Sequence, residues 1–412
     1  MSATPWMTTD DLVEAIKRKI AMPTFQSTFS YDDIVKFLNE EMMISQVPRL
    51  LQYHEEYYVF KKRIPLKSNV SRYAIPDRAV GMRLRDIKFV DTNGNYFDLT
   101  QIPADDKAFF QRSIGQNDAI HKFYVEGNDI VLTPTTITSP TGSLEMFFYI
   151  RPNQLAANTR AAICSSLQKT ITISNNATVT DSLSTVVIDN VSFVPKTVLD
   201  PQAVNEFLIG VDANATAANL AAAITNSASF SYLTATANSN TVTIISSNAT
   251  MPWIVNNDAN CYTFTNQHQV VCSTTIPSNI TTSVLVDLLQ TRPGHRTYGY
   301  DVKPQAVSGS TIVINDSDMP ATFIVGDYIC EQYECIIPYL PPDLHNGLAE
   351  MASSRILAAQ GDAAGLQMAQ AKIEEIDKQT NRIIADRAES TPLKLNAKGS
   401  ILRYGRMGRN RW

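Results

Sequence analysis

Residue types that could carry out catalysis or bind a metal are few in this sequence and widely separated. His54 opens a His-Glu-Glu stretch like that of a zinc-protease helix, but the second histidine required four residues later is missing. Cys261, His268 and Cys272 are ligand types for zinc, although no closely spaced cysteine pair accompanies them. Zinc needs its ligands converging on one point. We therefore interpret these residues as part of a core or loop cluster and predict no metal site.

Carboxylate pairs and phosphate-binding loops give no stronger indication of an enzyme. Asp105-Asp106 and Glu374-Glu375 are adjacent in sequence, so on a helix or a strand their side chains point apart and are expected on solvated faces. The sequence has no GxxxxGK[ST], GxGxxG or GxSxG motif, and its five histidines are scattered. The five cysteines, an odd number without tight spacing, indicate reduced thiols. We predict a protein that is not an enzyme, with no catalytic residues and no cofactor.

The C-terminus carries the clearest binding signal. The net charge of the chain is -5, yet the stretch after Ser390 contains lysines and arginines and no Asp or Glu. Three interpretations are open: a solvated terminus, a basic arm that binds nucleic acid, or a peptide that docks on a protein. Arginine and aromatic residues are typical anchors of a shaped protein interface, which favours docking. The residues predicted to dock are Arg403, Tyr404, Arg406, Arg409, Arg411 and Trp412.

Composition indicates a globular chain. At 412 residues, with 44% hydrophobic and 18% charged residues, the sequence exceeds the usual size of a single core and predicts two or three domains. No stretch is apolar for long enough to span a membrane as a helix, and the first residues do not resemble a signal peptide. We expect a soluble protein that is made in a cytosol and has no membrane partner.

Helices are expected at both ends of the chain. Thr8 with Asp11, and Ser30 with Asp33, have the spacing of capping boxes within residues 1–56. Residues 341–390 show a second helical pattern with a nearly heptad seam. The helix faces predicted to pack in the bundle or in a ring are Leu12, Ile16, Ile34, Leu38, Leu366, Ile373, Ile376 and Ile383.

Between the helices the pattern changes to a period of two, which indicates strands. Residues 57–157 predict a β region, in which DTNGNY around Gly94 is a strong turn signal, and residues 291–340 continue it. Residues 158–290 contain only ten Asp, Glu, Lys or Arg residues and are interpreted as an inserted β-rich module. The predicted fold class is therefore α+β: a helical bundle built from N- and C-terminal hairpins, antiparallel β regions inserted between them, and an extended basic tail at 391–412.

This order of elements resembles the head-to-tail adaptor, or connector, proteins of short-tailed bacteriophages. The similarity lies in the opening helix pair (DLVEAIKRKIAMPTFQSTFSYDDIVKFLNEEM), in RLLQYHEEYYVFKKRIPL, SRYAIPDRAVGMRLRDIKFVD and FYIRPNQL, and in the closing stretches IIPYLPPDLHNGLAEMASSRILAAQGDAAGLQMAQAKIEEIDKQ and SILRYGRMGRNRW. It covers most of residues 8–155 and 295–405. The module at 158–290 departs from the shorter members of that family, and we expect it to be peripheral.

The resemblance implies a structural virion protein at the head-tail junction, synthesised in the host cytoplasm. It implies a homo-oligomeric ring of about a dozen copies, C-terminal tails that dock on the portal protein, and DNA that passes through the lumen without specific binding. A tail or nozzle protein would lie below the ring, and tail fibres would attach through the 158–290 module. The alternative is a tail or baseplate protein with a fibre- or host-binding β module. A DNA-binding packaging factor and a glycan hydrolase are rivals from other classes.

Overall fold

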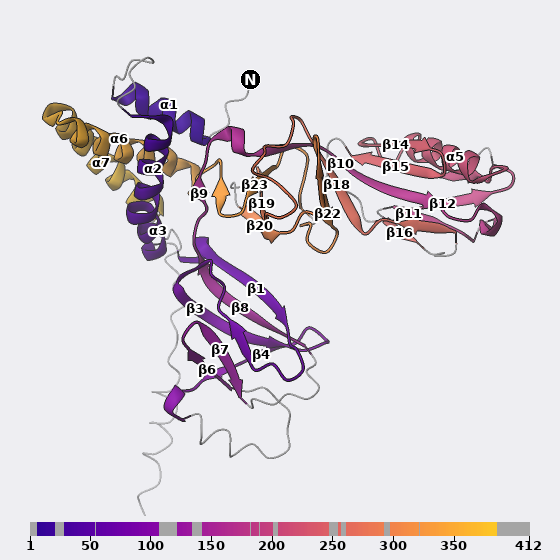
Figure 1. Cartoon of the computed structure of the whole chain (residues 1–412), viewed down its shortest axis with the longest axis horizontal. Helices are drawn as coiled ribbons and strands as arrows, with labels where there is room; N and C mark the ends of the chain where they lie inside the picture. Colours follow the sequence, from indigo (N-terminus) through magenta and orange to yellow (C-terminus); the bar gives the residue numbers. More distant parts are fainter. Residues whose placement is uncertain are drawn as a thin grey trace, which may run out of the picture. The chain divides into compact units, whose positions relative to one another are not determined.

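The computed structural model describes residues 6–20, 29–53, 55–106, 122–133, 142–181, 183–188, 190–200, 205–246, 254–256, 261–291, 297–320 and 322–384. The chain divides into two compact units. Figure 1 shows the helices and strands in colours that follow the sequence. Unit 1 combines Met1–Gln46 with Pro152–Glu374, and unit 2 combines Val47–Arg151 with Glu375–Trp412.

Two capped helices open unit 1. Helix α1 (Thr9–Lys19) begins after Thr8 and α2 (Tyr31–Glu41) after Ser30, and both starts have the reciprocal hydrogen bonds of a capping box. These bonds satisfy amide groups that have no partner within the helix. The two predicted capping boxes are confirmed. A π-helical turn, η1 (Met42–Gln46), follows α2 shortly before Pro48, whose missing N–H prevents regular helical hydrogen bonding.

Helix α6 (His345–Gln360) is the centre of the helical layer in unit 1. It is preceded by η6 (Pro342–Leu344) and ends at Gly361, whose φ of 76° is the left-handed conformation that glycine adopts at helix ends. Both α1 and α2 pack against it. Nine of its residues are buried, including Leu348 and Ile356, because it is covered on more than one side.

The predicted fold class is wrong, because the chain is mainly β and does not form a four-helix bundle with β insertions. In the described residues strands outnumber helices. Helix α7 (Ala363–Ile384) is the element that fails to join a bundle: Leu366 and Ile373 are only half-buried and Met368 is 76% exposed. A heptad pattern specifies a face that can pack, but it does not specify that a partner helix is present.

The main sheet of unit 1 is organised around the long strand β10 (Ala162–Ile173). Its order is β20-β19-β23-β10-β18-β22-β21, and β15 and β17 also pair with β10. Strands from residues 162–289 thus pair directly with strands from residues 297–331. The other strands are β14 (Leu233–Asn238), β15 (Thr241–Ser246), β17 (Tyr262–Phe264), β18 (Gln267–Cys272), β19 (Val286–Leu289), β20 (Thr297–Val302), β21 (Ala306–Ser308), β22 (Thr311–Asn315) and β23 (Tyr328–Glu331).

A smaller sheet and one helix complete the β part of unit 1. The order of this sheet is β13-β12-β11-β16, formed by β11 (Val186–Ile188), β12 (Val191–Lys196), β13 (Glu206–Leu208) and β16 (Ile254–Asn256). Helix α5 (Ala213–Thr225), capped by Asp212, lies beside β14 and β15 (Figure 1). Its buried residues Leu220 and Ile224 join the same core as Phe193 and Phe207 of the small sheet. A two-stranded parallel pair, β9 (Gln154–Leu155) with β24 (Glu334–Cys335), contacts helix α2 through β9.

Unit 2 contains two four-stranded sheets and the short helix α3 (Val47–Tyr53). The first, in the order β1-β8-β3-β4, consists of β1 (Val59–Pro65), β3 (Ala79–Val90), β4 (Tyr96–Asp98) and β8 (Ser143–Ile150). The second, in the order β2-β7-β6-β5, consists of β2 (Arg72–Ala74), β5 (Thr100–Gln101), β6 (Lys122–Glu126) and β7 (Asp129–Thr133). Gly94, with φ 86°, lies in the turn between β3 and β4, where a positive φ is needed.

Candidate functional site

Those candidate residues for chemistry that the structure describes do not converge on a common site. No group of three or more His, Cys, Asp or Glu residues in the described ranges could hold a metal ion. His54 lies outside the described residues. Cys261 and Cys272 are buried, and the Cys261 thiol lies within hydrogen-bonding distance of the Thr178 and Ser184 hydroxyls. The Asp105, Glu374 and Glu375 carboxylates are exposed.

His268 belongs to a buried charge cluster within the main sheet of unit 1. Its Nδ1 lies 2.7 Å from Oδ1 of Asp316, whose Oδ2 accepts a hydrogen bond from Nζ of Lys169 at 2.5 Å. Burial and the Lys169 charge lower the pKa of His268 to about 4, since Lys169 already balances the Asp316 carboxylate. The histidine is therefore neutral at pH 7, and the cluster joins β10, β18 and the end of β22.

The predicted docking tail, from Arg403 to Trp412, lies outside the described residues. The predicted helix-face residues are divided between a buried set and a half-buried set. Leu12, Ile16, Ile34 and Leu38 are fully buried inside unit 1. Leu366, Ile373 and Ile376 of α7 are half-buried, and the side chain of Ile383 is not among those described.

Ion pairs join the opening helices to α6. Lys19 at the end of α1 pairs with Glu350, which is also 3.8 Å from Nζ of Lys372. Arg355 pairs with Glu41, a carboxylate whose side chain is only 8% exposed, and its Nη1 lies 2.9 Å from Oε2 of Glu40. Because partly buried charges are costly to leave unpaired, these contacts fix which faces of the helices meet.

His345 adds a neutral contact to the same layer. It is buried at the start of α6, where Nδ1 accepts a hydrogen bond from the amide of Met7 at 3.1 Å and Nε2 donates to the carbonyl of Leu340 at 3.2 Å. Burial lowers the pKa of His345 to about 4. An imidazole that accepts at Nδ1 must be unprotonated there, so the geometry and the pKa agree on a neutral ring.

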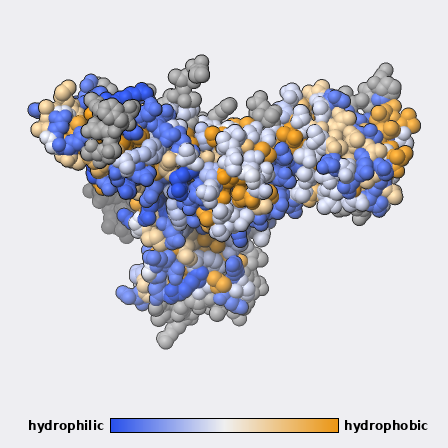
Figure 2. All heavy atoms as spheres, turned by 45° about the horizontal axis from the view of Figure 1, so that its top comes forward, coloured by the Kyte–Doolittle hydropathy of each residue, from blue (hydrophilic) through white to orange (hydrophobic). Residues whose placement is uncertain are grey.

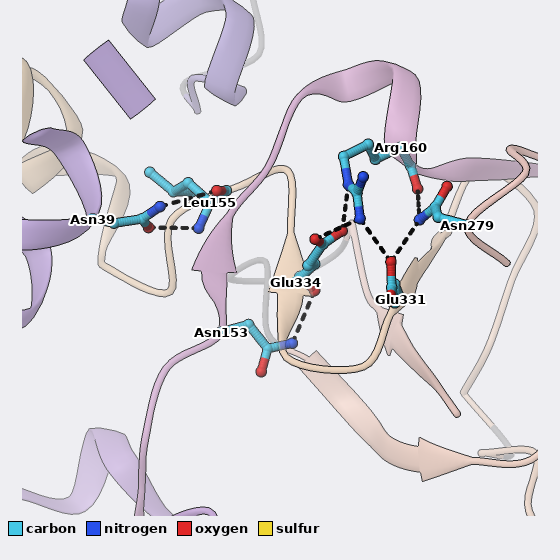
Figure 3. Close-up of polar contacts among 7 residues, drawn as sticks. All are labelled: Asn39, Asn153, Leu155, Arg160, Asn279, Glu331 and Glu334. Carbon is cyan, nitrogen blue, oxygen red and sulfur yellow. Dashed lines mark hydrogen bonds and ion pairs between the residues drawn. The ribbon is translucent and has the colours of Figure 1, made fainter. Parts of the chain in front are cut away.

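A polar junction connects this helical layer to the sheets of unit 1 (Figure 3). On its helical side, the side chain of Asn39 in α2 makes two bonds to the backbone of Leu155 in β9. Oδ1 accepts from the Leu155 amide at 2.6 Å, and Nδ2 donates to its carbonyl at 3.0 Å. The amide side chain thus pairs with β9 as a neighbouring strand would. In the next part of the junction, Asn153 donates to the carbonyl of Glu334 at 3.0 Å.

Arg160 holds the sheet side of this junction. It lies in η4 (Asn158–Arg160), and its Nε and Nη2 each donate to the Glu334 carboxylate at 2.8 Å, while Nη2 also contacts Glu331 at 2.7 Å. Nδ2 of Asn279 donates to the Arg160 carbonyl at 3.3 Å and to Glu331 at 3.2 Å (Figure 3). Hydrogen bonding to Glu334 raises the pKa of Arg160, which remains charged. A planar guanidinium can make such a two-atom contact, whereas an ammonium cannot.

The junction residues were not identified from the sequence. One signal was present: Arg160 is the only arginine between residues 158 and 290. Its partners lie more than a hundred residues away along the chain, and no local spacing indicates such a pairing. The role that this arrangement supports is structural, because its hydrogen bonds and ion pairs connect α2, β9, β23 and β24 to one another.

Comparisons with known proteins identify no relative, since neither a family model nor a curated protein matches the chain. The described part of the chain has no helix that is both long and apolar enough to cross a membrane.

Proposed function

We propose that this protein is a structural adaptor of a tailed-bacteriophage virion, located at the junction of head and tail and without enzymatic activity. Its copies form a ring through which DNA passes, and the C-terminal tail of each copy docks on the portal protein. A tail or nozzle protein lies below the ring. The proposal extends the sequence resemblance described above to the protein's function.

The observation that carries the proposal is the helical layer of unit 1. Helices α1 and α2 come from the start of the sequence and pack on α6 from its end, with the ion pairs of Glu350 and Arg355 between them. These helices contain the longest stretches of the resemblance. A ring is closed by contacts between neighbouring copies. The polar junction suits a subunit of such a ring, because Asn39 joins the helical layer to β9 and Arg160 joins η4 to the carboxylates of β23 and β24.

The composition of the tail supports docking on a protein. Fixing about a dozen residues costs on the order of 12–24 kcal/mol of backbone entropy, so a bound tail needs strong anchors. Buried arginine and aromatic anchors contribute roughly 2 kcal/mol or more each, and Arg403, Tyr404 and Trp412 are of these types. Repetition around a ring adds avidity that a single tail lacks.

The decisive experiment is deletion of residues 400–412 followed by a binding assay with the purified portal protein of the same virion. We expect at least a tenfold loss of affinity, because about 1.4 kcal/mol is enough for that change and several anchors are removed. A matched control replaces Arg403, Arg406, Arg409 and Arg411 with lysine, which keeps the charge but removes planar hydrogen bonding.

The outcomes separate the alternatives. Weak binding by both variants supports a shaped docking site. Full binding by the lysine variant would show that charge alone is recognised, and full binding by the deletion variant would overturn the tail-docking proposal. Electron microscopy of the purified protein with the portal tests whether a ring forms, and we expect closed particles with cyclic symmetry.

A further inference from the structure

Strand β13 is an edge strand with hydrogen-bonding groups that face away from its sheet. In the described residues its only strand partner is β12, in a parallel pair. The carbonyl of Asn205 accepts from the Val194 amide at 3.0 Å, and the amide of Ile209 donates to the carbonyl of Lys196 at 2.9 Å. The backbone groups of successive residues alternate in direction along a strand. Asn205 and Ile209 face β12, so the even-numbered residues between these two turn their amides and carbonyls to the open edge.

Those residues are Glu206 and Leu208. The carbonyl of Leu208 accepts a hydrogen bond from Nδ2 of Asn219 at 2.8 Å. Within the described ranges, no acceptor is found for the amide of either residue. An edge with such groups is a template for another strand.

A groove of about 460 Å³ runs between this edge and α5. Its helix side is formed by small residues, among them Asn219, Ala222 and Ala223, so the backbone of a third segment can approach closely. Leu199 and Leu208 line its strand side and are 46% and 38% exposed. A groove between a sheet edge and a helix fits the mode in which an extended peptide adds a strand to a sheet.

Apolar residues continue beyond the groove. Val198 follows β12 and Val211 follows β13, and the parallel pairing of the two strands places both residues at the same end of the sheet. They are 79% and 99% exposed. Figure 2 shows hydrophobic atoms gathered at the right-hand end of the view, over the part of unit 1 that contains this sheet. Clustered exposed apolar residues indicate a contact surface.

The charge of the groove selects the partner. Among the described residues, Glu206 is the only ionisable one that lines it. Nζ of Lys196 lies between Asp181 at 3.7 Å and Glu206 at 3.9 Å, so this single lysine is shared by two carboxylates. Asp200 adds a further negative charge beside Glu206, to which its amide donates a hydrogen bond. The surroundings are therefore acidic and complement a basic segment.

We infer that the groove between β13 and α5 binds an extended strand of another protein, in which apolar and basic residues alternate. The apolar residues contact Leu199 and Leu208, the basic residues lie near Glu206, and the backbone pairs with the open edge. The inference rests on the proposed function in one respect: on a virion adaptor, the partner is a tail fibre or tail protein. The site itself follows from the edge, the groove and the charge.

The test uses the full chain and fluorescent synthetic peptides in an anisotropy titration. One peptide alternates lysine and valine, a second alternates glutamate and valine, and a third is the lysine peptide with methyl groups on alternate backbone nitrogens. We expect the lysine peptide to bind at least tenfold more tightly than either of the others. Equal binding of the lysine and glutamate peptides, or no loss on N-methylation, would overturn the inference.

Substitutions locate the binding. Ala222→Trp fills the groove from an exposed position of α5 and should weaken binding at least tenfold, whereas Ala237→Trp, on an exposed position of β14, is the matched control and should not. Glu206→Gln keeps the size of the side chain that lines the groove and removes its charge, so it should reduce the preference for the lysine peptide over the glutamate peptide. Unchanged binding by the Ala222→Trp protein, with native circular dichroism, places the peptide elsewhere and contradicts the site.

The same proteins separate this inference from the proposed function. Portal attachment depends on the C-terminal tail, so the Ala222→Trp protein should attach to the portal normally. If the Ala222→Trp protein loses peptide binding and still attaches to the portal, both proposals are supported. If the unmodified protein attaches to the portal but does not bind the peptide, only the inference about the groove is overturned.

Discussion

Acidification should destabilise unit 1 through His345. The folded protein keeps this ring neutral, with a pKa of about 4, whereas the unfolded chain binds a proton near the ordinary pKa of 6.5. Because the unfolded state binds the proton more readily, the stability is fully present above pH 6.5 and is lost as the pH falls from 6.5 towards 4. The proton also removes the Nδ1 acceptor for the Met7 amide.

The magnitude follows from the two pKa values. The loss of unfolding free energy amounts to about 2 kcal/mol at pH 5 and about 3 kcal/mol at pH 4, since each pKa unit of difference corresponds to about 1.4 kcal/mol. His268 has a similarly lowered pKa and adds a loss of the same sign over the same range. The pH dependence of the unfolding free energy of the wild type therefore combines the contributions of both histidines, and a variant is needed to separate them.

His345→Asn provides that separation. Asparagine cannot be protonated in this range, and its Oδ1 can take the place of Nδ1 as the acceptor for the Met7 amide. Urea denaturation of both proteins between about pH 7.5 and about pH 4 measures the difference in unfolding free energy. The wild type should lose stability relative to the variant by the amounts given above, and the slope that remains in the variant belongs to His268 and the carboxylates. Parallel profiles would refute the reasoning, because they would mean that the ring is protonated equally in both states.

Three further predictions concern a buried ion pair, a glycine at positive φ and the cysteine thiols. Glu41→Gln should lower the unfolding free energy by about 2 kcal/mol, because it leaves Arg355 without its buried charged partner. Glu40→Gln, at an exposed carboxylate, should change the unfolding free energy by less than about 0.5 kcal/mol. Urea denaturation compares the two variants. Gly142→Ala should cost about 3 kcal/mol or more, since φ is 114° and an added Cβ would overlap a ring and a carbonyl, whereas Gly94→Ala, also at positive φ but in open space, should cost about 1 kcal/mol. Equal thermal shifts for the two glycine variants would contradict the steric argument. The five cysteines are buried, so a thiol reagent should modify them only when the protein unfolds; rapid labelling of the native protein would show that one of them is accessible.

Local signals in the sequence predicted the structure well. The capping boxes at Thr8 and Ser30 specify the starts of two helices because the bonds involved span only three residues. The Asn-Gly turn at Gly94 likewise specifies a hairpin, which is observed between β3 and β4. In both cases the groups that interact are close in sequence, so their spacing contains the required information.

Long-range partners were not predictable in the same way. The seam of α7 has the period of a packed helix, yet Leu366 and Ile373 stay half-buried, because periodicity describes one surface and not its partner. The contacts of Arg160 depend on how β23 and β24 lie beside η4, and β10 pairs with strands from distant parts of the sequence. For the same reason the helical bundle was overestimated, since the strand content of the chain is assembled by pairings that no local pattern specifies.

Strands β10 and β17 also determine where the chain could be shortened. Ile173 pairs with Tyr262, and the amide of Ser174 donates to the carbonyl of Cys261 at 2.9 Å, so two points of the chain on either side of residues 175–260 lie next to each other. A short turn could close these two ends as a hairpin, and β15, which pairs with Leu167–Thr172 of β10, would be removed together with the intervening stretch. Such a graft point allows a whole substructure to be gained, exchanged or lost between related proteins while the strands on either side keep their register.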